Sequence, residues 1–405
     1  MPLRIARQPC VGTSPSVLPT MEIPMTTRRR FLTSAAIGAA ALAAAPLVAQ
    51  AQLRPGDVVP TRGTPGSRSL PTNATSSGRW RPQAVTGFGG APIGNHFAAA
   101  SEADAQGALE AAWNAGARVF DTSPWYGLGL SERRFGHFLS QQPRDSYVLS
   151  TKIGRLLTAS RNPKKTGWID ASPFDYRYDY SAEGTRRSVE DSLQRLGVSH
   201  LDIVLVHDLS EDNGDIGARW PEYFEQARTG AFVELTRMRE EGLIKAWGMG
   251  VNTPEPALRA VEVADPDIFL LACQYSLLDH ERALAQTFPR LAERGISVIV
   301  GSPLLAGYMT GRDRYLYGPY WTLPGGMAAK RARANEIAAK HGVDIRTAAL
   351  QFAAVPEVVS VVAPGARNAA QARANVESMT VSIPAEFWVD LRREGIISAD
   401  APVPD

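Results

Sequence analysis

Cysteine is nearly absent from this chain of 405 residues. There are two, Cys10 and Cys273, and Cys10 lies within an N-terminal segment that we expect to be removed. A mature chain with one thiol cannot form an internal disulfide, so its stability must come from a buried core. With 44% hydrophobic and 21% charged residues, the chain has the composition that a large core requires.

The chain also lacks a strong excess of either charge. Its formal net charge is +2, but residues 1–51 contain five arginines and one glutamate, which is +4 and leaves −2 for the remainder. A nearly neutral body gives no reason to expect nucleic acid or an anionic membrane surface as a partner.

Long apolar runs are scarce, and the one that stands out is the Ala-rich stretch 35–48. It is shorter than the ~20 residues that a membrane span needs. It follows TRRRFL (27–32) and precedes the small-residue pattern AQA (49–51), an order typical of a twin-arginine export signal. The alternative is a basic tail before an anchoring helix. We expect residues 1–51 to be the leader, with Met25 as its start and 1–24 over-called. We also expect export by the twin-arginine machinery to the periplasm, and no stable membrane span in the mature chain.

Residues 52–83 are rich in Pro, Gly, Ser and Thr and are expected to be a flexible linker. Apolar, β-rich runs then alternate with helical patterns over residues 84–395. The runs lie near 84–90, 118–123, 147–153, 203–208, 246–252, 269–276, 297–303 and 358–364. The helical patterns lie at 102–115, 131–140, 181–196, 221–241, 254–264, 280–294, 327–341, 344–354 and 368–379. Eight short strands with helices between them predict a single-domain α/β fold, the (β/α)8 TIM barrel; an open sheet of six or seven strands is the alternative.

Two connections are longer than a turn requires. Residues 154–180 and 304–326 are both rich in Tyr and Trp. Long loops in compact domains often cover or form binding sites. Most of these rings are expected to pack within their own loops, and a few to line a pocket, where aromatic rings offer stiff surfaces to a sugar or ring substrate.

Four ionisable residues follow or end the second, third and fourth predicted strands: Asp121, Tyr126, Lys152 and His207. Strand ends meet at one face of a barrel. A phenol with its ordinary pKa of ~10 is a poor acid or base near neutral pH unless a cation favours the phenolate. Lys152 can supply that cation and Asp121 can hold it, so Tyr126 becomes a usable acid or base. A neutral His207 can polarise a substrate oxygen.

Each of these residues alone has a simpler explanation. Asp121 before Thr-Ser-Pro can cap a turn, His207 can be a satisfied core residue, and Tyr126 or Trp125 can be part of a wall. The combination of the four at strand ends favours an active site. We expect no metal ligand set, and Trp125 to contact the substrate.

Several motifs carry a resemblance to a known family, and they occur in that family's order between about residues 84 and 380. They are FDTSPWYG (120–127) with SER (131–133), STKIG (150–154), SLQRLG (192–197) leading to DIVLVH (202–207), GMGVN (248–252), QYS (274–276) and PGARN (364–368). The chain resembles the aldo-keto reductases. Within them, WYGLGLSERR (125–134), KIGRLL (152–157) and HD (207–208) are most similar to the aldose 1-dehydrogenase group, which includes fucose, galactose and pyridoxal dehydrogenases.

The resemblance implies a barrel that binds NADP or NAD without a Rossmann domain. It gives the catalytic roles to Asp121, Tyr126, Lys152 and His207. In the family, an aromatic residue that stacks on the nicotinamide often occupies the position of Gly301. The remaining residues that the resemblance assigns to the cofactor are Asn252 and Gln274 at the carboxamide, Ser302, Pro303, Leu304 and Gly307 beside the pyrophosphate, and Gly365, Arg367, Gln371 and Asn375 at the phosphate and adenine end. Without it, Asn252 could simply cap the following helix and Arg367 could be a solvated helix-start residue.

The leading hypothesis is therefore an NAD(P)-dependent oxidoreductase that acts on an aldose, an aldehyde or a related alcohol. Tyr126 would donate or accept the proton while hydride moves at the nicotinamide. One alternative is an exported barrel with weak or no turnover that binds a ligand or cofactor. Another is a Schiff-base aldolase with Lys152 as its nucleophile. The presence of all four ionisable residues favours the oxidoreductase.

Overall fold

The computed structural model describes residues 66, 69–74, 78–317 and 321–404, which belong to one compact unit. The expected leader, residues 1–51, lies outside these residues, as does the 52–65 part of the expected linker.

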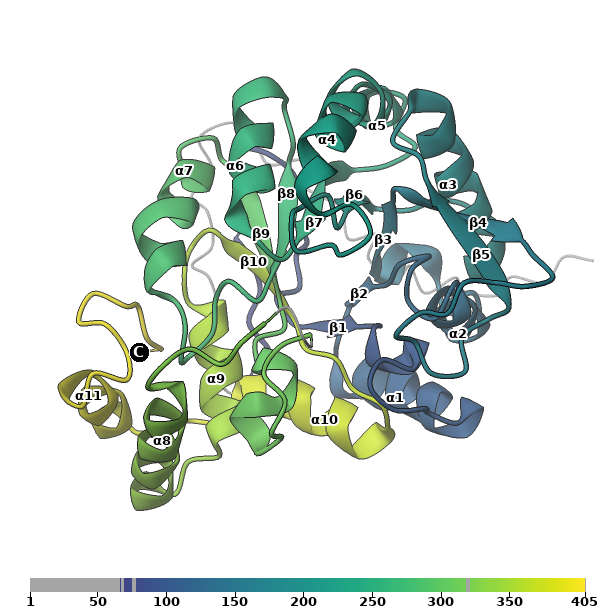
Figure 1. The fold of residues 1–405 in the computed structure, drawn as a ribbon. Coiled ribbons are helices and arrows are strands. Elements are labelled where there is room, and N and C mark those ends of the chain that lie inside the picture. The colour runs from purple at the N-terminus through teal and green to yellow at the C-terminus, as the bar shows by residue number, and fades with distance from the viewer. Residues whose placement is uncertain (1–65, 67–68, 75–77, 318–320, 405) are drawn as a thin grey trace, which may run out of the picture. The chain divides into compact units, whose positions relative to one another are not determined.

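Eight parallel strands form the central sheet in their order along the chain (Figure 1). They are β1 Gly87–Gly89, β2 Val119–Asp121, β3 Val148–Ile153, β6 Ile203–His207, β7 Ala246–Val251, β8 Ile268–Ala272, β9 Ser297–Gly301 and β10 Val359–Ala363. Parallel bridges from Thr86 to Val362 and from Gly89 to Gly365 join the first strand to the last. The sheet therefore closes on itself, which confirms the (β/α)8 barrel and excludes the open sheet.

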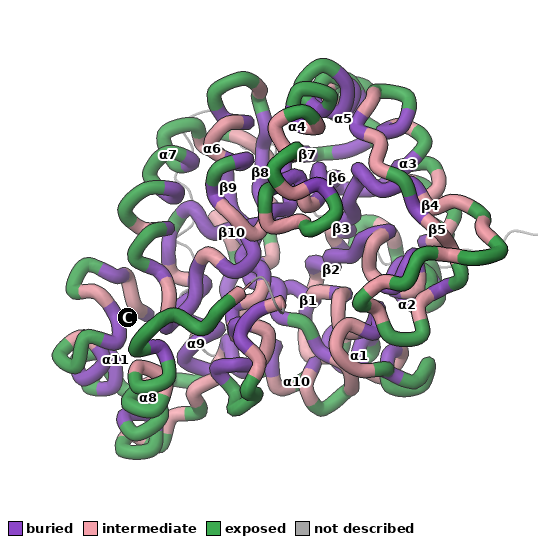
Figure 2. Tube along the Cα trace, viewed as in Figure 1, coloured by how far each residue is buried: buried purple, intermediate pink, exposed green. Residues whose placement is uncertain are grey.

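The burial of the strands explains why they read as continuous apolar runs. Every residue of β6 to β10 is buried, as the purple centre of Figure 2 shows. A parallel sheet with helices outside and packed side chains inside has no face in contact with water, so alternation with polar residues is lost.

Helices surround the strands (Figure 1). They are α1 Glu102–Ala115, α2 Leu130–Leu139, α3 Ala182–Leu196, α4 Trp220–Thr229, α5 Ala231–Glu240, α6 Pro254–Val263, α7 Phe288–Ala292, α8 Met327–His341, α9 Ile345–Ala354, α10 Ala369–Glu377 and α11 Ala385–Arg393. The bounds of α1 follow from its caps. The Ser101 hydroxyl accepts a hydrogen bond from the Asp104 N–H, and Gly116 ends the helix with φ 107°, a conformation that glycine adopts readily.

The predicted helix 221–241 is two helices that meet at Gly230. A Cβ on Gly230 would lie 2.6 Å from the Tyr180 carbonyl oxygen and 2.8 Å from the Ser181 Cα. The backbone before α3 thus passes too close for a side chain, and the break permits that approach.

The long connection 154–180 contains an antiparallel hairpin, β4 Arg155–Ala159 and β5 Phe174–Tyr178, that the sequence did not indicate. Its strands leave the barrel directly after β3, so residues of the hairpin lie at the same end as the ends of the barrel strands.

The described residues between 69 and 83 contact the barrel. Thr72 forms an antiparallel bridge with Ala84, and the Asn73 side-chain amide donates to the carbonyls of Pro82 and Ser360, both at 2.7 Å. This short segment is thereby attached to β10. None of the helices in the described part of the chain is long and apolar enough to cross a membrane.

Candidate active site

A buried ion pair connects the ends of β2 and β3. The Lys152 Nζ donates to the Asp121 Oδ2 at 2.7 Å and to the Thr122 carbonyl at 2.8 Å. Both side chains are buried, and burial raises the pKa of the Asp121 carboxyl although the Lys152 ammonium opposes that rise. The carboxylate therefore depends on Lys152 for its charge.

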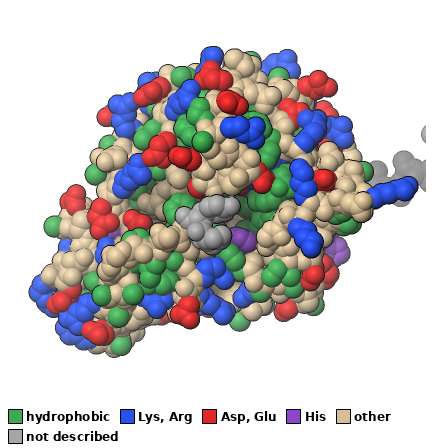
Figure 3. All heavy atoms as spheres, in the orientation of Figure 1, with side chains coloured by type: hydrophobic (Ala, Val, Ile, Leu, Met, Phe, Trp, Pro, Cys, Tyr) green, Lys and Arg blue, Asp and Glu red, His purple; other side chains and the backbone are tan. Residues whose placement is uncertain are grey.

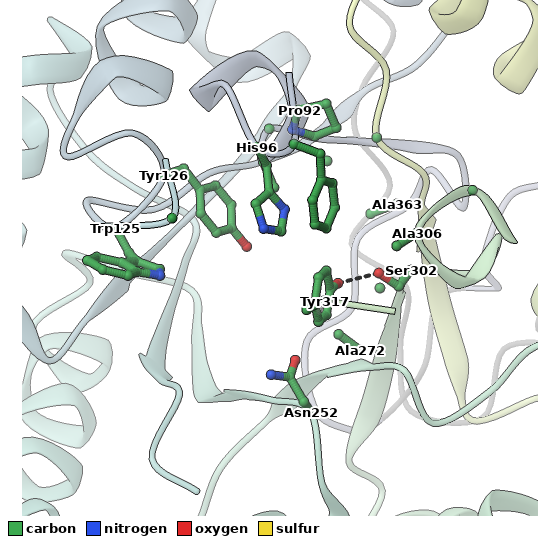
Figure 4. Close-up of a pocket in the computed structure, with 18 of the residues that line it drawn as sticks. Pro92, His96, Trp125, Tyr126, Asn252, Ala272, Ser302, Ala306, Tyr317 and Ala363 are labelled. Atoms are coloured by element: carbon green, nitrogen blue, oxygen red, sulfur yellow. Dashed lines mark hydrogen bonds between the residues drawn. The ribbon is translucent and has the colours of Figure 1, made fainter. Parts of the chain in front are cut away.

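Tyr126 lies in the turn between β2 and α2, with its ring 4.6 Å from the Lys152 Nζ and 5.8 Å from the His207 ring. Its hydroxyl makes no hydrogen bond with a described residue and points into an open space (Figure 4). Burial, Asp121 and Asp208 raise the pKa of Tyr126 well above its usual value. The sequence suggested that Lys152 would favour the phenolate, but burial and the two carboxylates outweigh the opposing cation, Arg155, and the phenol carries its proton.

His207 ends β6 and its imidazole is held in one tautomer. Its Nδ1 lies 3.1 Å from the Ser123 hydroxyl, which also accepts the Trp125 backbone N–H at 3.1 Å. If Nδ1 carried the proton, the buried Ser123 hydroxyl would have no acceptor among the described residues for its own. Ser123 therefore donates to Nδ1. Burial, Lys152 and Arg155 lower the pKa of His207 well below its usual value, so the ring is neutral and its one proton is on Nε2.

These groups line a cavity of about 1180 Å³ at the carboxyl ends of the strands, and Figure 3 shows the hollow on this face. A cavity of this size is large enough for a dinucleotide together with a small substrate. Fourteen of the residues that the sequence assigned to the site line it: Asp121, Trp125, Tyr126, Lys152, His207, Asn252, Ser302, Pro303, Leu304, Gly307, Gly365, Arg367, Gln371 and Asn375. Gln274 does not.

The family model described as "Aldo/keto reductase family" matches residues 86–393, which include the whole barrel. This chain belongs to the aldo/keto reductase family. Membership makes it an NAD(P)-dependent oxidoreductase.

Curated relatives agree with this membership over most of the chain. Pyridoxal 4-dehydrogenase from Microbacterium luteolum is 37% identical over 77% of this chain and 94% of that protein. D-threo-aldose 1-dehydrogenase from a Pseudomonas species is 35% identical over the same shares of the two chains. L-galactose dehydrogenase from Arabidopsis thaliana is 30% identical over 73% of this chain and 84% of that protein.

Solved structures share the fold at lower identity. The holo form of an aldo-keto reductase from Bacillus halodurans superposes with a TM-score of 0.59 and 21% identity, over 84% of this chain and 97% of that one. A glycerol dehydrogenase from Gluconobacter oxydans superposes with a TM-score of 0.56 and 21% identity, over 84% and 98% of the two chains. The barrel of this aldo/keto reductase is therefore that of its solved relatives.

The two amides expected at the nicotinamide differ in their surroundings. The Asn252 amide donates to the Asp212 Oδ2 at 2.8 Å, which fixes its carbonyl side toward the cavity that it lines. The Gln274 amide donates to the Val251 carbonyl at 3.3 Å, and its Oε1 is buried without a hydrogen-bond partner among the described residues. Asn252 is therefore in place to meet a carboxamide in the cavity, whereas Gln274 is not among the residues that line it.

The other end of the cavity fits the phosphates of a dinucleotide. Arg312, Arg314 and Arg367 line it, and none of the three makes an ion pair with a described residue. Burial, Arg312 and Arg367 lower the pKa of Arg314, so neighbouring cations repel one another here. Such a cluster binds anionic oxygens. In this aldo/keto reductase, Arg367 directly precedes Asn368, the N-cap residue of α10, and the N-terminus of that helix adds further N–H donors.

Aromatic side chains that the sequence did not assign to the site form one wall of it. Figure 4 shows Tyr317 opposite Tyr126, with its hydroxyl bonded to Ser302. His96 lies 4.7 Å from the Trp168 ring and 5.6 Å from the Tyr317 ring. Trp168 and Tyr317 come from the two long connections, whose Tyr and Trp content was the available signal.

Gly301, where other family members often carry an aromatic residue, is tightly surrounded in this aldo/keto reductase. A Cβ there would lie 3.0 Å from the Leu270 side chain and 3.1 Å from that of Ala272. In this chain, the aromatic surface on that side of the cavity comes from Tyr317.

Proposed function

We propose that this protein transfers hydride between NAD(P) and the carbonyl or hemiacetal carbon of an aldose or a ring aldehyde, with Tyr126 as the proton donor or acceptor. The observation that carries the proposal is the Tyr126 hydroxyl, which has no hydrogen bond with a described residue while its ring contacts Lys152 and His207. Two relatives are named for a ring aldehyde and for an aldose.

The residues divide the work by their chemistry. When bound, the nicotinamide supplies or accepts the hydride. The His207 Nε2–H donates to the substrate oxygen and holds it beside Tyr126. Tyr126, protonated in the empty site, donates its proton to that oxygen during reduction and takes one back during oxidation. Asp121 holds the Lys152 ammonium in place 4.6 Å from the centre of the Tyr126 ring, and the ammonium lowers the cost of the phenolate that forms.

The aldolase alternative is not supported by the state of Lys152. A Schiff base requires a free amine, but the Lys152 Nζ donates to a carboxylate and a carbonyl at the bottom of the cavity. The cationic end formed by Arg312, Arg314 and Arg367 would also have no role in that reaction.

The Tyr126→Phe variant tests the proposal. Turnover of aldoses and aromatic aldehydes should fall about 100- to 10,000-fold, the usual contribution of a positioned acid or base. Fluorescence titration with NADPH and NADH should show nearly unchanged binding. Tyr147→Phe is the matched control, because its buried hydroxyl donates to the Leu139 carbonyl away from the cavity. Equal turnover of the Tyr126 variant and the wild type would reject the assignment.

We further propose export to the periplasm by the twin-arginine machinery, on the basis of the sequence of residues 27–51. Because this route carries folded proteins, the enzyme could leave with its cofactor bound. Fractionation of cells that express the full chain should place the wild type in the periplasm and a variant with Arg28→Lys and Arg29→Lys in the cytoplasm. The same fraction for both proteins would contradict the proposal.

A further inference from the structure

A second buried ion pair lies beside the proposed catalytic groups. The Arg155 Nη1 contacts the Asp208 Oδ2 at 2.9 Å, and the Arg155 side chain is only 4% exposed. The guanidinium lies 4.3 Å from the Trp125 ring centroid and 4.9 Å from that of Tyr178, whose hydroxyl accepts from Nε at 3.1 Å. Arg155 is therefore fixed on several sides, and it fixes Asp208 in turn.

The other oxygen of Asp208 contacts His207. The distance from the Asp208 Oδ1 to the His207 Nε2 is 3.3 Å. Asp208 has φ 45°, and its N–H donates to the Gly250 carbonyl at 2.9 Å, so the chain turns sharply as β6 ends. A left-handed conformation is costly for a residue with a side chain and persists where the surroundings impose it. Here the left-handed conformation of Asp208 places its carboxylate next to the His207 Nε2, the nitrogen that would bind the substrate oxygen.

This pair is more than a structural contact. A buried ion pair contributes little net stability compared with apolar side chains of the same size. Both residues line the cavity, the Asp208 side chain is 18% exposed, and the Arg155 Nη2 makes no hydrogen bond among the described residues. A strong acceptor and a strong donor thus remain available side by side, directly next to the reacting position.

We propose that Asp208 and Arg155 form a subsite for a hydroxyl on the carbon next to the reacting carbon. A hydroxyl both donates and accepts, so it can donate to the Asp208 Oδ1 and accept from the Arg155 Nη2. The substrate class is then the 2-hydroxy aldehydes and their cyclic forms, the aldoses, rather than aldehydes without that hydroxyl. This inference rests on the proposed function, since it takes the substrate oxygen to be at His207 Nε2.

The test compares an aldose with its 2-deoxy counterpart. Hydrogen bonds to charged groups are worth more than neutral ones, so wild-type kcat/KM should favour the hydroxylated substrate about 10- to 100-fold. In Asp208→Asn, which keeps the size but removes the charge, this ratio should fall toward one. Intrinsic differences in reactivity between the two sugars cancel, because the same pair of substrates is used with each protein.

Asp191→Asn is the matched control. Asp191 is a carboxylate of α3 that, like Asp208, is paired with an arginine, Arg187, but it is not among the residues that line the cavity. Its substrate ratio should equal that of the wild type. An Asp208 that only positions His207 would lower kcat/KM for both sugars equally and leave the ratio unchanged, and this result would overturn the subsite.

The wild type alone gives an independent decision, even if the Asp208 variant fails to fold. If the wild type turns over both sugars with equal kcat/KM, the subsite proposal is wrong, while the proposed function still holds. If wild-type protein turns over neither sugar nor any aldehyde although it binds the cofactor, the proposed function itself fails.

Discussion

The two ends of the cavity treat charge in opposite ways. At the end with Tyr126, the two buried cations have carboxylate partners: Lys152 contacts Asp121 at 2.7 Å and Arg155 contacts Asp208 at 2.9 Å. At the end beside α10, Arg312, Arg314 and Arg367 have no such partner among the described residues.

The difference indicates two uses of charge. The partner of a paired charge offsets it at long range, so the pair serves to hold a side chain and to set the proton affinity of the groups in direct contact with it. An unpaired cluster raises the energy of the empty protein and is relieved by a ligand of opposite charge. The paired end is therefore suited to chemistry on a neutral substrate, and the unpaired end to binding an anion.

The largest expected effect comes from breaking a pair. In Lys152→Met, the buried Asp121 carboxylate loses its partner, and the free energy of unfolding should fall by about 3–5 kcal/mol. Turnover should fall about 1,000-fold or more, since the charge that eases formation of the phenolate is removed as well. Urea denaturation and a steady-state assay measure the two effects.

A double variant separates these effects. Lys152→Met with Asp121→Asn removes both charges, so much of the lost stability should return while turnover stays low. If the double variant is no more stable than the single one, the ion pair is not the reason for the loss.

A smaller effect is expected at the unpaired end. Arg367→Met should weaken cofactor binding about 10- to 100-fold, as expected for the loss of charged hydrogen bonds to phosphate, and should leave unfolding unchanged. Fluorescence titration with NADPH and with NADH measures it, and a larger loss for NADPH would place Arg367 at the 2′-phosphate. Arg187→Met, which removes an exposed arginine of α3, should alter neither titration. Wild-type affinity of the Arg367 variant for both cofactors would contradict the comparison.

The smallest effect concerns how the unpaired charges act on their surroundings. Burial, with Arg314 next, lowers the pKa of His96 to about 4. Above pH 6.5 the ring is neutral in both the native and the unfolded chain. Between pH 6.5 and 4 the unfolded chain binds the proton more strongly, so the free energy of unfolding decreases as the pH is lowered. At pH 4.5 the loss that His96 causes should be on the order of 1 kcal/mol, allowing for partial exposure.

Unfolding midpoints at pH 7.5 and 4.5 test this effect. The wild type should lose more stability than His96→Gln, because all other titrating groups are common to both proteins. Arg314→Met should lie between the two. An equal loss for the wild type and the His96 variant would mean that His96 titrates normally.

Much of the fold could be predicted because local signals agreed with the tertiary structure. Helix α8, Met327–His341, has the predicted bounds, since Gly342 ends it in a left-handed conformation. The β4–β5 hairpin was missed because residues 160–173 separate its two strands, a connection much longer than the ~2–5 residues that indicate a hairpin in a sequence. The break at Gly230 was missed because its cause is the backbone of Tyr180, 50 positions earlier in the chain.

The site was predictable in its residues more than in its energetics. Strand ends of a barrel converge, so Asp121, Lys152 and His207 could be placed together from sequence. The proton affinity of Tyr126 could not, because it depends on how deeply the phenol is buried. The Asn252 amide donates to Asp212 on a different loop, and no local sequence pattern predicts that hydrogen bond.

The Ser123 hydroxyl has a consequence for the fraction of molecules ready to react. A neutral imidazole in water divides between two tautomers, and an enzyme that needs one of them loses apparent efficiency in proportion to the other. Because Ser123 donates to Nδ1, His207 is held in the tautomer that carries its proton on Nε2, which faces the cavity. The imidazole can therefore donate to the substrate oxygen as soon as the substrate binds, with no prior exchange between the two tautomers.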